Sequence, residues 1–91
     1  MYKIRVMISG DVQGVWFRVS AQDKANELKL TGWVKNLFSN AVEIEAEGKR
    51  DELAIFAGWL TTGPPNATIE KISVEWEELP ERKFSSFEIQ K

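Results

Sequence analysis

Two residue types that often carry catalysis are missing from this chain. Its 91 residues include no cysteine and no histidine. The first absence excludes disulfide bonds and thiolate chemistry, and the second removes the commonest general base and the commonest metal ligand. Any catalysis by this chain must therefore work without these two side chains.

The chain also lacks a long apolar run and an excess of positive charge. No apolar stretch is long enough to span a bilayer, and residues Met1–Arg5 alternate without the apolar core of a signal peptide. We expect a cytoplasmic protein that does not contact membranes. The net charge of -2 argues against a nucleic-acid partner. A chain this short supports one hydrophobic core, so residues 1–91 are expected to form a single domain. We also expect the protein to be a monomer.

The hydrophobic pattern predicts strands and helices in alternation. Ser20, with Asp23 in the following turn, resembles a helix N-cap, and Gly63 with the two prolines after it is expected to end the second helix. The expected elements are a strand over residues 2–8, a helix from Ser20 to before Thr31, a strand over 33–38, a hairpin at 39–41, a strand over 42–47, a helix opened by Gly48, a strand around 72–76 and a short strand at 87–89.

This order is typical of an α+β, ferredoxin-like β-α-β-β-α-β sandwich with a short extra strand at the C-terminal end. Two helices cover one face of an antiparallel sheet in this fold, and we expect the other face to meet water. Oppositely charged side chains on neighbouring strands of that face can pair, each pair contributing less than about 1 kcal/mol. The expected members are Lys3, Arg5 and Lys71 with Glu43, Glu45, Glu47 and Glu75.

The segment Ile8–Arg18 carries the strongest functional signal. Gly10 and Gly14 can adopt positive φ, so the backbone N–H groups between them can converge on one anion, and Arg18 adds a charged planar fork. Two interpretations are open, because the same glycines could simply turn a strand into a helix. The glycine spacing matches neither a Walker loop nor a dinucleotide fingerprint, which disfavours nucleotide binding.

A second candidate segment is Gly32–Asn36. Asn36 is a polar amide in a predicted strand, and it either belongs to a site or begins the turn toward the hairpin. Lys35 is interpreted as a solvated surface residue. Trp33 and Trp59 are expected in or at the edge of the core, whereas Trp16, inside the glycine loop, is the tryptophan expected to line a site.

Together, Gly10–Arg18 and Gly32–Asn36 resemble the paired motifs of the acylphosphatase family. Further segments resemble the family pattern, so the resemblance spans essentially the whole chain; they are Ala25–Leu28 with Leu30, Gly63–Ala67 and Phe84–Ile89. One position departs from it, because Asn40 stands at the hairpin where the family usually has glycine. Asparagine tolerates the left-handed region best among non-glycine residues, so we expect the turn to persist.

The resemblance implies hydrolysis of the carboxyl–phosphate bond of small acyl phosphates, giving a carboxylate and inorganic phosphate without metal or cofactor. It assigns phosphate binding to Arg18 and orientation of the attacking water to Asn36. The loop amides would hold the phosphate oxygens; this loop comprises Asp11, Val12, Gln13, Gly14, Val15, Trp16 and Phe17. The alternative is a non-catalytic ferredoxin-like module that binds an anion, a small regulatory ligand or RNA. Glu43, Glu45 and Glu47 on the strand where RNA-binding domains carry aromatic residues would repel phosphate and disfavour RNA.

Overall fold

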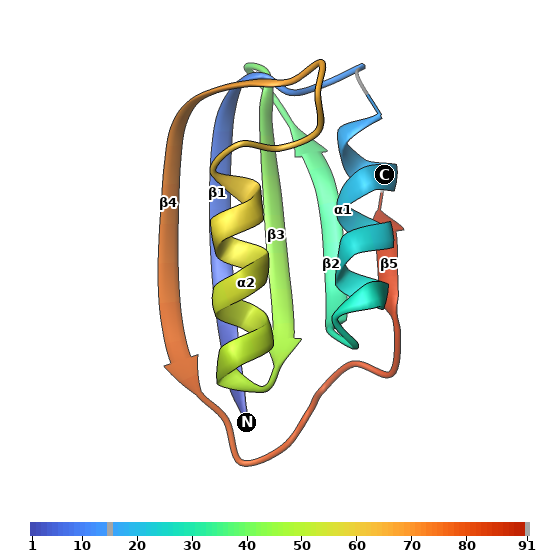
Figure 1. Ribbon diagram of the computed structural model, residues 1–91, viewed down its shortest axis with the longest axis vertical. Coiled ribbons are helices and arrows are strands. Elements are labelled where there is room, and N and C mark those ends of the chain that lie inside the picture. The colour runs from blue at the N-terminus through green and yellow to red at the C-terminus, as the bar shows by residue number, and fades with distance from the viewer. Residues whose placement is uncertain (15, 91) are drawn as a thin grey trace.

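The computed structural model describes residues 1–14 and 16–90, which form five strands and two helices (Figure 1). In chain order they are β1 (Tyr2–Asp11), α1 (Phe17–Glu27), β2 (Thr31–Leu37), β3 (Ala41–Gly48), α2 (Arg50–Leu60), β4 (Thr68–Glu78) and β5 (Phe87–Gln90). This order confirms the predicted ferredoxin-like α+β fold. Gly48 ends β3 and does not open α2, which begins at Arg50. Neither described helix is long and apolar enough to cross a membrane.

The strands form one sheet in the order β4-β1-β3-β2-β5. The first four pair antiparallel, as predicted, but β5 pairs parallel with β2. The difference arises from the connection between β4 and β5, residues 79–86, which crosses the end of the sheet before the chain enters beside β2 (Figure 1). Because the connection leaves β4 and enters β5 at the same end of the sheet, β5 runs opposite to β4 and therefore in the same direction as β2.

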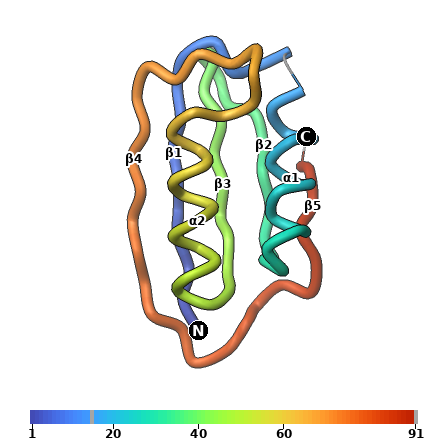
Figure 2. Tube along the Cα trace, viewed as in Figure 1, coloured from blue at the N-terminus to red at the C-terminus, as the bar shows by residue number. Residues whose placement is uncertain are grey.

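Both helices lie on the same face of the sheet (Figures 1 and 2). Alternate residues of β1 and β3 point toward them and are buried, while α1 and α2 each contribute a buried stripe, as the period of the apolar residues predicts. The core residues from these elements are Ile4, Val6, Ile8, Phe17, Ala21, Ala25, Val42, Ile44, Ala46, Leu53, Phe56 and Leu60.

The outer face of the sheet is less open than predicted. Glu45 is only 7% exposed, and its Oε1 atom lies 3.5 Å from Lys3 Nζ and 3.3 Å from Arg5 Nη2. Arg5 Nε also lies 3.7 Å from Glu43 Oε2. The predicted cross-strand pairs of β1 with β3 are therefore present. The other three predicted members, Lys71, Glu75 and Glu47, form no ion pair among the described residues.

Glu47, predicted to face water, is fully buried. The connection between β4 and β5 covers it, and Glu47 Oε1 accepts hydrogen bonds from the backbone N–H groups of Lys83 (2.9 Å) and Phe84 (3.0 Å). Arg82 fixes the same segment by donating to the Thr31 hydroxyl at 2.9 Å and to the Glu47 carbonyl at 3.2 Å. These bonds hold the connection against the end of the sheet, and thus guide the chain into β5.

Candidate active site

The loop after β1 adopts the conformations that its glycines allow. Gly10 has φ 136° and Gly14 has φ 77°, as predicted. A Cβ atom at Gly10 would collide with the Thr68 carbonyl oxygen of β4, where the β1–β4 register shifts, so this position also requires a small residue. At Gly14 no described atom would lie within contact distance, and only the positive φ favours glycine there.

Helix α1 begins at Phe17, immediately after the loop. The predicted N-cap at Ser20 is wrong, because the Ser20 N–H already donates to the Trp16 carbonyl at 2.9 Å within the first helical turn. Trp16 occupies the cap position with φ 62° and ψ 22°, and makes no side-chain cap hydrogen bond. The left-handed residue starts the helix early, and Arg18 consequently lies in the first turn, where the helix dipole contributes partial positive charge.

Asn36 lies within β2 and not in the turn, because β2 continues to Leu37. The register pairs Asn36 with Val42 of β3. Val34, two residues earlier on the same strand face, is fully buried in the core beneath the helices. Asn36 therefore faces the helix layer near the end of the strand, on the side where α1 begins.

The side chain of Gln13 ties the loop to the β2–β3 hairpin. Its Nε2 atom donates to the Leu37 carbonyl at 2.7 Å and to the Ala41 carbonyl at 2.9 Å. The hairpin between these carbonyls contains Ser39 and Asn40, with φ of 63° and 58°, so Asn40 takes the left-handed conformation predicted for it. Gln13 thereby couples the loop to the strand that carries Asn36.

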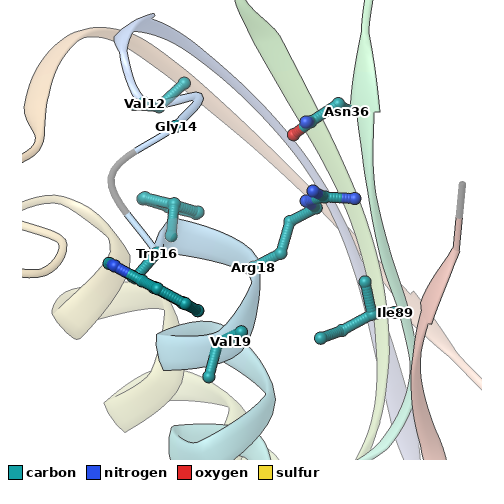
Figure 3. Close-up of a pocket in the computed structure, with 8 residues that line it drawn as sticks. Val12, Gly14, Trp16, Arg18, Val19, Asn36 and Ile89 are labelled. Atoms are coloured by element: carbon teal, nitrogen blue, oxygen red, sulfur yellow. The ribbon is translucent and has the colours of Figure 1, made fainter.

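The loop, α1, β2 and β5 border a cavity of about 350 Å³ that is open to solvent on one side. Figure 3 shows the Arg18 guanidinium extending toward Asn36. The cavity is lined by Val12, Gly14, Trp16, Phe17, Arg18, Val19, Asn36 and Ile89. Six of the residues predicted for the site thus meet at one cavity. Two others, Asp11 and Gln13, line a separate depression with Asn40, and Val15 lies outside the described residues.

The two polar side chains of the cavity have unused hydrogen-bonding capacity. Asn36 Oδ1 is buried and has no hydrogen-bond partner among the described residues. Across the same described part of the chain, Arg18 forms no ion pair. A buried acceptor without a partner costs about 1–3 kcal/mol, so a ligand or water that donates to it would be favoured. The pair can therefore offer charge and a fork of donors from Arg18 beside an amide acceptor and donor from Asn36.

Sequence reasoning did not place two residues at the cavity. Val19 follows Arg18 on the first turn of α1 and could have been found from helical spacing relative to Trp16. Ile89 comes from β5, and its place depends on the parallel pairing of β5 with β2, which pairs Ile89 with Val34. No local signal in the sequence indicates that pairing.

The predictions for Trp59, Trp33 and Lys35 are confirmed only in part. Trp59 packs at the core edge, where its ring centroid lies 6.2 Å from that of Phe56 and 6.3 Å from that of Phe17. Trp33 lies instead on the outer face, because its register partner is Glu45. There Lys35 Nζ lies 5.1 Å from the Trp33 ring centroid and 3.9 Å from Glu43 Oε1, so Lys35 is held between partners and is not simply solvated.

Comparisons of the sequence and the fold with known proteins point to one family. The family model described as "Acylphosphatase" matches residues 4–89. The chain is 49% identical over 86 residues to an acylphosphatase of Coxiella burnetii, covering 94% of this chain and 88% of that one. It is 44% identical over 86 residues to an acylphosphatase of Legionella pneumophila, covering 94% and 92%. The crystal structure of acylphosphatase from Bacillus subtilis superimposes with a TM-score of 0.93 at 37% identity, over all of both chains. The chain thus belongs to the acylphosphatase family.

Proposed function

We propose that this chain hydrolyses the carboxyl–phosphate bond of small acyl phosphates in the cavity beside α1. The single observation that carries the proposal is that Arg18 and Asn36, from separate elements, line one cavity with unsatisfied polar capacity. The transition state of phosphoryl transfer to water needs positioning and charge stabilisation more than covalent catalysis. Arg18 can supply the charge, and the Asn36 amide can orient the water.

In the proposed mechanism the Arg18 guanidinium binds the phosphate oxygens, together with N–H groups of the loop and of the first turn of α1. Asn36 holds a water molecule through its unpartnered Oδ1, in line with the bond to be broken. The water oxygen forms a bond to phosphorus while the bond between phosphorus and the carboxyl oxygen breaks. The electron pair leaves with the carboxylate, and the proton of the water passes to a phosphate oxygen.

This chemistry is compatible with a chain that has no histidine. A carboxylate is stable as a leaving group and needs no general acid, and the phosphate itself accepts the proton of the water. In the proposed site, the Arg18 guanidinium neutralises the charge of the phosphate.

The test is steady-state hydrolysis of benzoyl phosphate by the wild type and by Arg18→Ala. We expect kcat/KM to fall by about 10³-fold or more, which corresponds to roughly 4 kcal/mol of transition-state stabilisation. Arg50→Ala is the matched control, because Arg50 lies at the start of α2, at the other end of the sheet (Figure 1), and contacts Trp76. Near-normal turnover by Arg18→Ala would contradict the role of Arg18. A folded wild type that binds inorganic phosphate without hydrolysing the substrate would support the non-catalytic alternative.

Asn36→Ala separates orientation of water from binding. We expect kcat to fall by about 10²-fold, because the water loses its positioning partner, while inhibition by inorganic phosphate changes by less than about threefold. Measured values of kcat, KM and the phosphate inhibition constant distinguish the two roles. A loss confined to KM and phosphate affinity would make Asn36 a binding residue.

A further inference from the structure

The cavity has an apolar side that the proposed phosphate chemistry does not use. Three apolar side chains line it away from the Arg18 and Asn36 head groups: Trp16 and Val19 on the α1 side and Ile89 on β5 (Figure 3). Trp16 is 76% exposed and Val19 is 38% exposed, although large apolar side chains are stabilised by burial. Two exposed apolar side chains at the same cavity form a surface that a ligand can cover.

The size of the cavity also exceeds what phosphate requires. If each of the five heavy atoms of a phosphate group took the ~30 Å³ share of a water molecule, the group would occupy about 150 Å³. That is less than half of the cavity of about 350 Å³. The cavity therefore has room for a second chemical group attached to the phosphate, and Trp16, Val19 and Ile89 are among the side chains that line it.

The backbone conformation of Trp16 also indicates that this side chain contacts a ligand. Its φ of 62° lies in the left-handed region, which is unfavourable for a bulky residue that is not glycine. The other two positions of this loop with positive φ, Gly10 and Gly14, are glycines, whereas this position is a tryptophan. An exposed indole kept in a strained conformation at the cavity points to a contact made when the cavity is filled.

We propose that Trp16, Val19 and Ile89 bind the acyl group of the substrate, and that the chain prefers acyl phosphates with an aromatic or branched aliphatic acyl group over acetyl phosphate. The inference rests on the proposed function and adds the chemical class of the substrate to it. The acyl group packs against the indole and the two aliphatic side chains while Arg18 holds the phosphate. Apolar contact made equally in the ground and transition states lowers KM more than it raises kcat.

The test compares kcat and KM for benzoyl phosphate and acetyl phosphate in the wild type, Trp16→Ala, Trp16→Phe and Val19→Ala. In the wild type we expect kcat/KM to be about 10- to 100-fold higher for benzoyl phosphate. Trp16→Ala lowers the ratio of kcat/KM for benzoyl phosphate to that for acetyl phosphate by about tenfold, mainly through KM for benzoyl phosphate. Val19→Ala lowers the same ratio by about threefold. Trp16→Phe keeps most of the wild-type ratio. Phe38→Ala is the matched control, since Phe38 is 96% exposed in the hairpin and does not line the cavity.

The outcomes separate this inference from the proposed function. Equal kcat/KM for the two substrates in the wild type, or a ratio that Trp16→Ala and Val19→Ala leave unchanged, would overturn the acyl-group surface while hydrolysis itself stands. A ratio that Phe38→Ala lowers as much as Trp16→Ala would also overturn it. Absence of hydrolysis of both substrates by the folded wild type would overturn both proposals.

Discussion

Replacement of Gln13 by leucine isolates the contact that joins the loop to the hairpin. Leucine keeps the bulk of the side chain and the backbone N–H, and removes only the amide that donates to the Leu37 and Ala41 carbonyls at 2.7 and 2.9 Å. Each hydrogen bond contributes about 0.5–1.5 kcal/mol net, so the two stabilise the docked loop by roughly 1–3 kcal/mol. If the site works only with the loop docked, kcat/KM falls by about 5- to 150-fold.

Gln22→Leu is the matched control for this variant. Gln22 makes the same kind of bond, from Nε2 to the Phe87 carbonyl at 2.9 Å, but it joins α1 to β5 and leaves the loop untouched. Both variants should lose stability, by about 1–3 kcal/mol for Gln13→Leu and about 0.5–1.5 kcal/mol for Gln22→Leu. Only Gln13→Leu should also lose more than about fivefold in kcat/KM.

The assay is hydrolysis of benzoyl phosphate at a temperature at which urea denaturation shows both variants fully folded. The loss in Gln13→Leu should appear in kcat as well as KM, because an undocked loop misplaces Arg18 relative to Asn36. Wild-type kcat/KM in Gln13→Leu, or an equal loss in Gln22→Leu, would refute the reasoning that this contact assembles the site.

Three further predictions concern stability and metal dependence. Glu47→Gln should lower the free energy of unfolding, measured by urea denaturation, by about 1 kcal/mol, and Glu47→Ala should lower it by about 2–6 kcal/mol. Only alanine leaves the two backbone N–H donors without an acceptor. Equal losses in the two variants would contradict this. Gly32→Ala should lower the free energy of unfolding by about 2 kcal/mol or more, because Gly32 has φ 143° and a Cβ atom would collide with the Glu45 carbonyl. Gly58→Ala in α2 should instead raise it by about 0.5–1 kcal/mol. Thermal melts of the two variants test both expectations. EDTA should leave the hydrolysis rate unchanged, and a rate that falls and returns with added Mg²⁺ would point to another mechanism.

Local patterns were sufficient for most of the element order. Alternation in β1 and β3, the apolar stripe of α2 and the glycines of the loop depend on neighbours a few residues away, and the structure agrees with them. The start of α1 at Phe17 was missed because it depends on a left-handed tryptophan, which propensity rules do not favour.

Burial on the outer face could not be read from alternation. A period of two shows which residues share a face, but it does not show what covers that face. Glu45 is buried among cationic side chains from β1, and Glu47 is buried by a connection that arrives from the far end of the chain. Both contacts join residues remote in the sequence.

The sequence by itself determined the ferredoxin-like order of elements, the absence of cysteine and histidine chemistry, and the motifs that indicate the acylphosphatase family. Only the tertiary structure decided that Asn36 faces the first turn of α1, that Gln13 joins the loop to the hairpin, and that Ile89 lines the same cavity as Trp16. The physical reason is that helices, strands and turns follow from short-range periodicity and backbone conformation. A cavity instead forms where strands pair over long sequence separations, and β2 meets β5 in parallel only after the chain has crossed the end of the sheet.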